Sequence, residues 1–293
     1  MEVEMFFDDG VWYRGRIVSL SHGVATVFFD DGDVQQVSLP HPDVRPAPPP
    51  PPVRLQTRDG RSLRSRAVLL CVPMGVMQQG AIKFEPSLPS WKHDAIRRAG
   101  NGLINKLTVE YREVFWDPQV DFFGTTSSRA EDRGAFFLVW SLVRFTGRPI
   151  LIAVLSGEAA RKYESMSDEL VVKKFQEAMS SIFGQLPQPE RSHVTRWGSN
   201  PHARGAYSFV KVGSMGGPDY DLLAEPVGGQ VFFAGEGTCR EHPATAAGAY
   251  LTGLREAARL HRLLSEMQAQ RRKDLKEEVE EKQASFTDME EGN

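Results

Sequence analysis

Apolar residues in the larger, later part of the chain follow two different periods. Branched and aromatic residues gather in short runs at 67–72, 103–116, 134–145 and 148–157, and such runs predict strands, the first of them buried. The segment 167–184 instead repeats apolar residues every three or four positions. Ser167 is suited to cap the start of that helix, and Gly184 to follow its end. Strands and helices that alternate in this way predict a mixed α/β (α+β) domain with a mixed sheet.

The first 45 residues have a different pattern, which predicts a small all-β module. The stretch VWYRGRIVSL alternates apolar and polar residues, and VATVFFDDGDVQQVSL reads as a strand, an Asp-Gly turn and another strand. Carboxylates recur at both FFDDG turns, but their spacing does not fit a helix-flanked calcium loop. Turn chemistry explains them better.

A proline-rich linker, residues 46–53, separates this module from the rest. Consecutive prolines cannot donate backbone hydrogen bonds and favour a stiff, extended spacer. After the linker, a hairpin around Asp59-Gly60 is predicted. The final helix, expected to begin near Ala244–Thr245, ends in a charged segment, 263–293, that is polar nearly all round and expected to project or fray.

The stretch VFFAGEGTCREHPATAAGAYLTGLREAARL, residues 231–260, predicts a buried strand, a turn at Gly235-Glu236 and a helix that opens on small residues. A carboxylate at the end of such a strand can accept hydrogen bonds from sugar hydroxyls, and a helix N-terminus can stabilise negative charge. The same pattern also suits an ordinary strand–turn–helix packing unit. Both interpretations remain open on these residues alone.

A dinucleotide site would normally include G-x-G-x-x-G between a strand and a helix. The chain offers two near matches, GNGLIN at 100–105 and GEGTCR at 235–240, and both lack the third glycine. Neither motif therefore qualifies as a loop that holds a pyrophosphate.

Composition and charge narrow the function classes. The 293 residues carry a formal net charge of −3, which gives no case for bulk nucleic-acid binding, so direct DNA binding is not expected. The two cysteines, Cys71 and Cys239, match no metal spacing and are interpreted as reduced thiols of an intracellular protein. No apolar run approaches the length of a membrane span, and no metal site is predicted.

Five sequence blocks, in order, carry a family resemblance: AVLLCVPMGVM, the long block from FEPSLPSW to REVFWD, RWGSNPHARGAYSFVKVGS, DYDLLAEPV and the 231–260 stretch. Over residues 54–262 the chain resembles the C-terminal half of a flavin-dependent amine oxidase, and is most similar to lysine-specific histone demethylases. The resemblance implies an amine-oxidase substrate domain followed by a strand and helix that contact FAD. It also implies a nuclear protein that acts on a histone tail or another amine.

The same resemblance implies the site residues. Lys106 of LINKL would be the catalytic lysine, a buried residue that holds a water near the flavin; the alternative is an ordinary strand lysine at the surface. His202, which replaces an aromatic residue of the demethylases, and Tyr207 would contact the amine, with Thr245 opposite. The segment Cys71–Pro73 would line the cleft. The residues implied to contact the cofactor are Trp197, Gly235, Glu236, Thr245 and Ala246.

Residues 3–45 resemble a Tudor domain, through DGVWYRGRI and ATVFFDDGDVQQV. That resemblance implies a cage of Phe7, Tyr13 and Phe29 for a methylated lysine or arginine of a peptide, with Asp31 attracting the cation. Gln35 stands where many such readers carry another aromatic residue. The alternative is that these aromatic rings fill the core of a small barrel.

The resemblances together predict an FAD-dependent amine oxidase of the histone-demethylase type, incomplete as given, because the phosphate-binding half of the family is not among these residues. FAD binding to the isolated chain is therefore expected to be weak or absent. The alternative is a non-catalytic chromatin module that combines a Tudor-like reader with a remnant oxidase fold.

Overall fold

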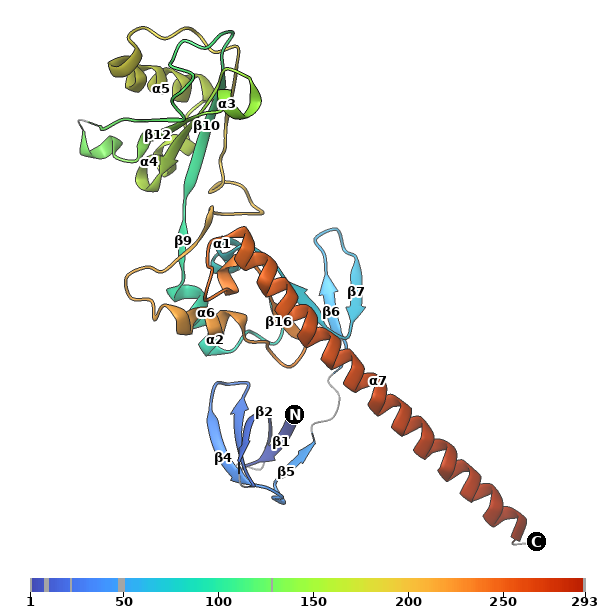
Figure 1. The fold of residues 1–293 in the computed structure, drawn as a ribbon. Helices are drawn as coiled ribbons and strands as arrows, with labels where there is room; N and C mark the ends of the chain where they lie inside the picture. The colour runs from blue at the N-terminus through green and yellow to red at the C-terminus, as the bar shows by residue number, and fades with distance from the viewer. Residues whose placement is uncertain (1, 8–10, 22, 47–50, 128, 292–293) are drawn as a thin grey trace. The chain divides into compact units, whose positions relative to one another are not determined.

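The computed structural model describes residues 2–7, 11–21, 23–46, 51–127 and 129–291. The chain forms two compact units that interleave along the sequence (Figure 1). Unit 1 comprises residues 1–70, 224–239 and 246–293, and unit 2 comprises residues 71–223 and 240–245.

Unit 1 begins with an antiparallel five-stranded sheet in the order β4-β3-β2-β1-β5. The inward residues of β3 are almost completely buried while their neighbours are not. In β2, where alternation was predicted, burial does not alternate, because only Gly15 is buried. The order leaves β4 and β5 as the two edges, so the all-β prediction is confirmed but a closed barrel is not. The strands are β1 (Glu2–Phe6), β2 (Trp12–Ser21), β3 (Val24–Phe29), β4 (Val34–Ser38) and β5 (Val44–Pro46).

Two small sheets follow in unit 1. Strands β6 (Val53–Gln56) and β7 (Ser62–Ser65) form the predicted hairpin, with Gly60 at a φ of +85° in its turn. Strand β8 (Val68–Leu70) pairs in parallel with β16 (Val231–Phe233). The prediction of a buried first strand was wrong, since Leu69 is 37% exposed. A sheet of two strands gives β8 a single strand neighbour, and therefore covers less of it than a wider sheet would.

Unit 2 is built on a second five-stranded antiparallel sheet, ordered β11-β12-β13-β10-β14. The predictions of strands at β10, β12 and β13 and of an amphipathic helix at α5 are confirmed. Ser167 caps α5 by accepting a hydrogen bond from the Leu170 amide, and Gly184 follows its last residue at a φ of +67°. The elements are β10 (Ile104–Glu110), β11 (Phe122–Gly124), β12 (Ala135–Ser141), β13 (Ile150–Ser156), β14 (Arg191–Val194), α4 (Gly157–Glu164) and α5 (Asp168–Phe183).

The main hydrophobic core of unit 2 lies between this sheet and helices α4 and α5. Residues that are completely buried come from β10, β12, β13 and both helices, which fixes the position of β10 beneath the site described below. Its largest members include Leu107, Tyr111, Phe136, Leu151, Leu155, Phe175 and Met179.

Shorter elements complete unit 2. Strand β9 (Gly100–Gly102) runs directly into β10 and pairs with β15 (Tyr207–Phe209). The end of the predicted strand 134–145 is instead a helical turn, α3. The remaining elements are α1 (Met74–Gln78), α2 (Ser90–Arg98), η1 (Ala130–Asp132), α3 (Val143–Thr146) and α6 (Gly217–Ala224).

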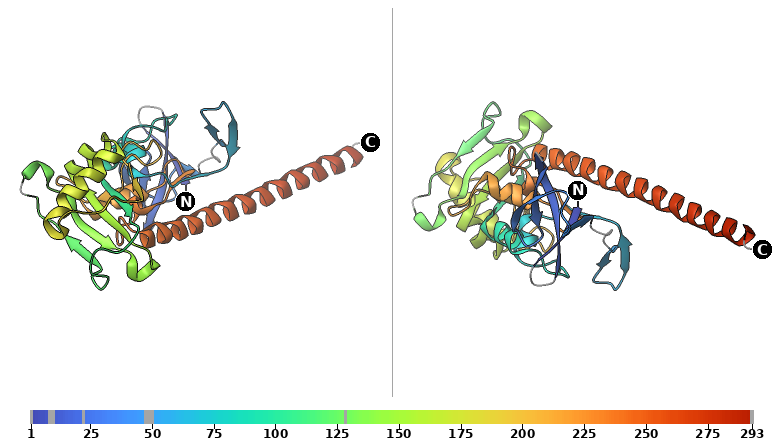
Figure 2. Two further views of the ribbon diagram at one scale, coloured as in Figure 1. Left: turned by 90° about the horizontal axis from the view of Figure 1, so that it is seen from above. Right: turned by 90° about the horizontal axis from the view of Figure 1, so that it is seen from below.

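The last helix, α7 (Ala246–Glu291), belongs to unit 1 and is preceded by the short turn η2 (Glu236–Thr238). Both views of Figure 2 show it as one continuous helix. It begins later than expected, because Ala244 has a φ of +60° and cannot belong to a right-handed helix.

Candidate active site

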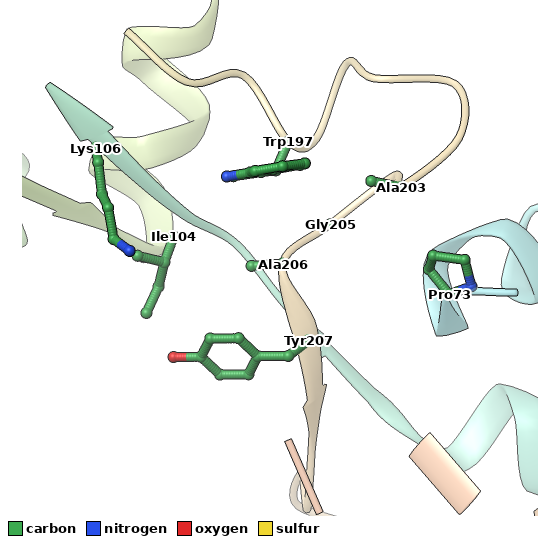
Figure 3. Close-up of a pocket in the computed structure, with 8 residues that line it drawn as sticks. All are labelled: Pro73, Ile104, Lys106, Trp197, Ala203, Gly205, Ala206 and Tyr207. Atoms are coloured by element: carbon green, nitrogen blue, oxygen red, sulfur yellow. The ribbon is translucent and has the colours of Figure 1, made fainter. Parts of the chain in front are cut away.

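The sequence-predicted residues Lys106, Trp197 and Tyr207 line one cavity of unit 2 (Figure 3). The cavity has a volume of about 320 Å³ and an apolar wall. Pro73, from the segment expected to line a cleft, also borders it. The other lining residues, Ile104, Ala203, Gly205 and Ala206, are small or aliphatic and leave room for a flat group between the two rings.

A buried polar network holds Trp197 at this cavity. The side chain of Asn105 is 1% exposed and its Oδ1 accepts hydrogen bonds from the Trp197 amide at 3.0 Å and from the Thr195 hydroxyl at 3.1 Å. Its Nδ2 donates to Oε1 of Glu164 at 2.9 Å. Both polar atoms of the Asn105 side chain are hydrogen-bonded. This satisfied network fixes the position of the Trp197 backbone.

Glu164 extends the network to Gly198, the residue after Trp197. The same Oε1 atom accepts a hydrogen bond from the Gly198 amide at 2.7 Å. A Cβ atom at position 198 would lie only 2.8 Å from Glu164 Oε2, so a larger residue there would have to displace this carboxylate. Arg196 completes the anchor by pairing with Asp168 at 2.6 Å and by donating to the Met166 carbonyl at 2.8 Å.

The GNG of GNGLIN has a structural role in β9. A Cβ atom at Gly100 would lie 2.3 Å from the carbonyl oxygen of Phe209, so only glycine lets β15 approach. Asn101 donates a hydrogen bond to the Arg204 carbonyl at 2.8 Å and so fixes the loop that delivers Gly205 and Ala206 to the cavity. Gly100 thus serves strand pairing, which gives the motif a structural role other than a phosphate loop.

Lys106 is exposed, and the prediction of a buried lysine was wrong. In β10, Asn105, Leu107 and Val109 point into the core, so strand alternation directs Lys106 to the opposite face. There its Nζ lies 5.9 Å from the ring centroid of Trp140. This distance lies within the range of a cation–π contact, which orients the ammonium group without burying it.

His202 and Thr245 do not line the described cavity. His202 is exposed, and its backbone amide donates to Asn200 Oδ1 at 2.9 Å. Thr245 is exposed, and its hydroxyl donates to the His242 carbonyl at 2.8 Å. Cys71 is exposed and Cys239 is buried, and no disulfide joins them.

In unit 1, the predicted cofactor-facing turn is clamped by helix α7. Gly235 has a φ of +114°, with open space where a Cβ would stand, and its amide donates a hydrogen bond to the Thr252 hydroxyl at 3.0 Å. Arg255 donates to the carbonyls of Phe233 and Thr238, at 3.0 and 2.9 Å. These contacts hold Glu236 at the end of β16.

A buried acid supports the clamp. Glu256 is 0% exposed, and its Oε1 atom pairs with both Arg255 and Arg259. Its Oε2 atom is buried without a hydrogen-bond partner among the described residues. Ala246 is exposed at the first position of α7, followed by exposed Ala247, so the helix begins with side chains that do not obstruct its amide groups.

The three predicted cage residues of the N-terminal sheet lie together. The Phe7 ring is 5.2 Å from that of Tyr13 and 5.4 Å from that of Phe29, both edge-to-face. Phe29 is only 2% exposed and belongs to the core of the sheet, whereas Tyr13 is 38% exposed. Asp31 is exposed and accepts a hydrogen bond from the Asp33 amide at 3.0 Å, as expected for a turn residue, and Gln35 is half-buried on β4. The methyl-ligand cage stays a prediction.

Sequence reasoning missed Asn105, Thr195 and Glu164. The missed signal was a polar residue at an inward position of an alternating strand, since Asn105 shares the face of Leu107 and Val109. Such a residue needs buried partners, and Thr195 and Glu164 supply them. In the described part of the chain no three His, Cys, Asp or Glu side chains come together to bind a metal.

A known protein family matches most of the chain. The model of the flavin containing amine oxidoreductase family matches residues 32–261. The chain belongs to this family. The match begins inside the N-terminal sheet, earlier than the predicted boundary at residue 54.

Curated relatives are lysine-specific histone demethylase homologues. Homologue 3 of Arabidopsis thaliana is 43% identical over 210 residues, which cover 71% of this chain and 13% of that protein. Homologue 2 of the same plant is 40% identical over 252 residues, with coverages of 84% and 31%. A possible demethylase of Drosophila melanogaster is 45% identical over 195 residues, with coverages of 62% and 22%. The chain thus spans less than a third of the length of these relatives.

Solved structures show the same fold. A putrescine oxidase variant with redesigned cofactor binding superposes with a TM-score of 0.57 at 22% identity, over 85% of this chain and 48% of that one. Among the described residues, no helix is both long and apolar enough to cross a membrane.

Proposed function

We propose that this chain contributes the amine-facing wall of an FAD-dependent oxidase that demethylates methylated lysine in a histone tail. The observation that carries the proposal is the convergence of Lys106, Trp197 and Tyr207 on one cavity. Relatives with 40–45% identity named as histone demethylases support lysine as the substrate class. A nuclear location is part of the same proposal.

The aromatic side chains would enclose the reacting amine. Trp197 and Tyr207 are 43% and 39% exposed and present their rings to the cavity, where a methylated amine gains both apolar contact and attraction to a ring face. Ala203, Gly205 and Ala206 leave space for the methyl groups. The cavity would thus select a slender, methylated amine over a bulky one.

Lys106 would act by hydrogen bonding at the open side of the cavity. Its ammonium group carries only donors and is oriented by the Trp140 ring. It can therefore hold a water molecule at a defined place and supply a proton when oxygen is reduced. The overall reaction converts a methylated amine, oxygen and water into the amine with one methyl fewer, formaldehyde and hydrogen peroxide.

The residues present fit the ring end of a flavin. Gly235 leaves an open approach at the end of β16, Glu236 supplies a carboxylate for hydroxyl groups, and Ala246 exposes the amide end of α7. When bound, a flavin would accept a hydride from the carbon attached to the amine nitrogen. The 293 residues contain no G-x-G-x-x-G for the pyrophosphate, so we expect the purified chain to retain little or no FAD.

The test supplies FAD in excess and measures hydrogen peroxide released by the chain with a dimethyl-lysine peptide. We expect peptide-dependent release that falls at least about tenfold in Lys106→Met, the effect of losing one positioned proton donor. Lys173→Met, an exposed lysine of unit 2 on α5, is the matched control and should keep the wild-type rate. Absence of peptide-dependent peroxide under conditions where FAD is bound would refute the proposed function.

A methylated peptide at the N-terminal sheet is a separate proposal, supported by the contact of the exposed Tyr13 ring with Phe7. Titration with methylated histone peptides should show weaker binding by Tyr13→Ala. Equal affinity of Tyr13→Ala and wild type would refute methylated-peptide binding at the N-terminal sheet.

A further inference from the structure

The β6–β7 hairpin carries a concentration of positive charge that the proposed oxidase function does not use. Residues 53–66 contain five arginines and one aspartate, a net charge of +4 in a chain whose total is −3. Every residue from 54 to 66 is exposed. The whole-chain charge, on which the expectation of no DNA binding rested, conceals this local excess.

The register of the hairpin places like charges opposite one another. Arg54 pairs with Arg64 across the two strands, and directly opposed side chains share one face at about 5 Å between Cβ atoms. Opposed like charges destabilise a sheet, and a two-stranded hairpin is marginal by itself. The arrangement is therefore costly unless an anion lies over that face.

The chain supplies a counter-ion for one of the five arginines. Asp59 forms an ion pair with Arg61 at 2.8 Å, and a hydrogen bond from Thr57 holds the pKa of Asp59 below its ordinary value, so this acid stays ionised. Arg54, Arg58, Arg64 and Arg66 form no ion pair with any acidic residue in the described ranges of the chain. Four guanidinium groups thus remain for an external anion.

We infer that the β6–β7 hairpin binds the phosphate backbone of duplex DNA. A two-stranded ribbon fits the major groove, which is about 12 Å wide, and guanidinium groups pair with phosphate in a two-pronged geometry. The four-residue strands are about 13 Å long, enough to span successive phosphates on both sides of the groove. A duplex of RNA has a deep, narrow major groove that does not admit such a ribbon.

The opposite face of the hairpin argues against a lipid surface. Leu55 and Leu63 are paired across the strands and lie on the face away from Arg54 and Arg64, because neighbours in a strand alternate. A membrane surface would require apolar side chains and cations on the same side. The hairpin places its leucines and its paired arginines on opposite faces. It is therefore suited to a polyanion that contacts only the arginine face.

The test measures binding of the full 293-residue chain to a short, fluorescent, random-sequence DNA duplex by anisotropy. It uses about 50 mM salt and several higher concentrations. Wild type should bind, with an affinity that falls as salt rises. The triple variant Arg54→Gln, Arg58→Gln, Arg64→Gln should bind about ten- to a hundredfold more weakly, and its salt slope should be smaller by about one for each arginine–phosphate pair removed.

A variant with the same change of charge provides the control. Arg112→Gln, Arg133→Gln, Arg191→Gln removes three exposed arginines of unit 2 and should bind DNA as wild type does. All substituted side chains are exposed, and circular dichroism checks that each variant is folded.

The inference is overturned if wild type does not bind the duplex or if both triple variants lose affinity equally. It is also overturned if the chain binds anionic vesicles or polyglutamate more tightly than DNA. The readout is binding, so its failure is distinct from a failure of amine oxidation.

Discussion

Strand β10, which carries Lys106, and strand β16, which leads to Glu236, are held in place by different means. Strand β10 pairs with β13 and β14 and covers a continuous apolar core with α4 and α5. Strand β16 pairs with β8 in a sheet of two strands, and its following turn is fixed by Thr252 and Arg255 of α7. Packing therefore determines the position of Lys106 in unit 2, and a few polar bonds determine the position of Glu236 in unit 1.

The two strands should therefore respond differently to substitution. A core distributes its stabilisation over many apolar contacts, so small polar changes on β10 have local effects. A turn that depends on one arginine and a buried acid responds strongly to the loss of either group. Two substitutions test this contrast, and a third tests a buried charge elsewhere in unit 2.

The largest effect is expected for Phe175→Ala in α5, because Phe175 is completely buried in the core beneath β10. Loss of the ring should reduce the free energy of unfolding of unit 2 by about 3–5 kcal/mol. Hydrogen exchange of β10 and β13 measures it. Leu170→Ala on the same helix, where the side chain is 41% exposed, should change protection much less. Similar losses for both variants would contradict a core that determines the position of β10.

Arg255→Met should release the turn at Glu236. It removes bonds to two carbonyls and leaves the buried Glu256 carboxylate with Arg259 alone, at an expected cost of about 2–4 kcal/mol. Faster hydrogen exchange confined to residues 231–240 is the expected signature. Arg262→Met, an exposed site on the same helix, should leave that segment unchanged. Unaltered exchange in Arg255→Met would mean that packing, not the clamp, holds the turn.

A smaller and pH-dependent effect is expected at Asp219, which is 1% exposed. Burial alone would raise the pKa of Asp219, but hydrogen bonds from Arg98, the Met215 amide and Ser214 together lower the pKa below the ordinary 3.8. A lowered folded-state pKa adds stability above about pH 4 that is lost as pH falls through the folded value. Asp219→Asn should reduce the unfolding free energy by about 1–3 kcal/mol near neutral pH.

That difference between wild type and Asp219→Asn should narrow as the pH falls below about 4. Denaturant unfolding at a series of pH values measures it. If the difference in unfolding free energy between the two proteins stays constant with pH, the charge on Asp219 does not contribute to the stability of unit 2.

The periodic segments could be predicted from sequence, and the polar contacts could not. Helix α5 and its Ser167 cap follow from local pattern, and so do strands β10 and β13. The bond between Asn105 and Trp197 joins residues 92 positions apart, and no local signal specifies that partner. The expectation of a buried Lys106 was taken from the family resemblance, whereas alternation along β10 in the structure directs its side chain away from the core.

We propose that this chain presents a methylated amine to a flavin, and anaerobic mixing provides a direct test of that step. The wild-type chain, excess FAD and a dimethyl-lysine peptide are combined without oxygen, and the visible absorbance of oxidised flavin is followed. We expect the flavin absorbance to bleach only when both the chain and the peptide are present, and to bleach more slowly in Lys106→Met. Flavin that stays oxidised although both FAD and peptide are shown to bind would contradict it.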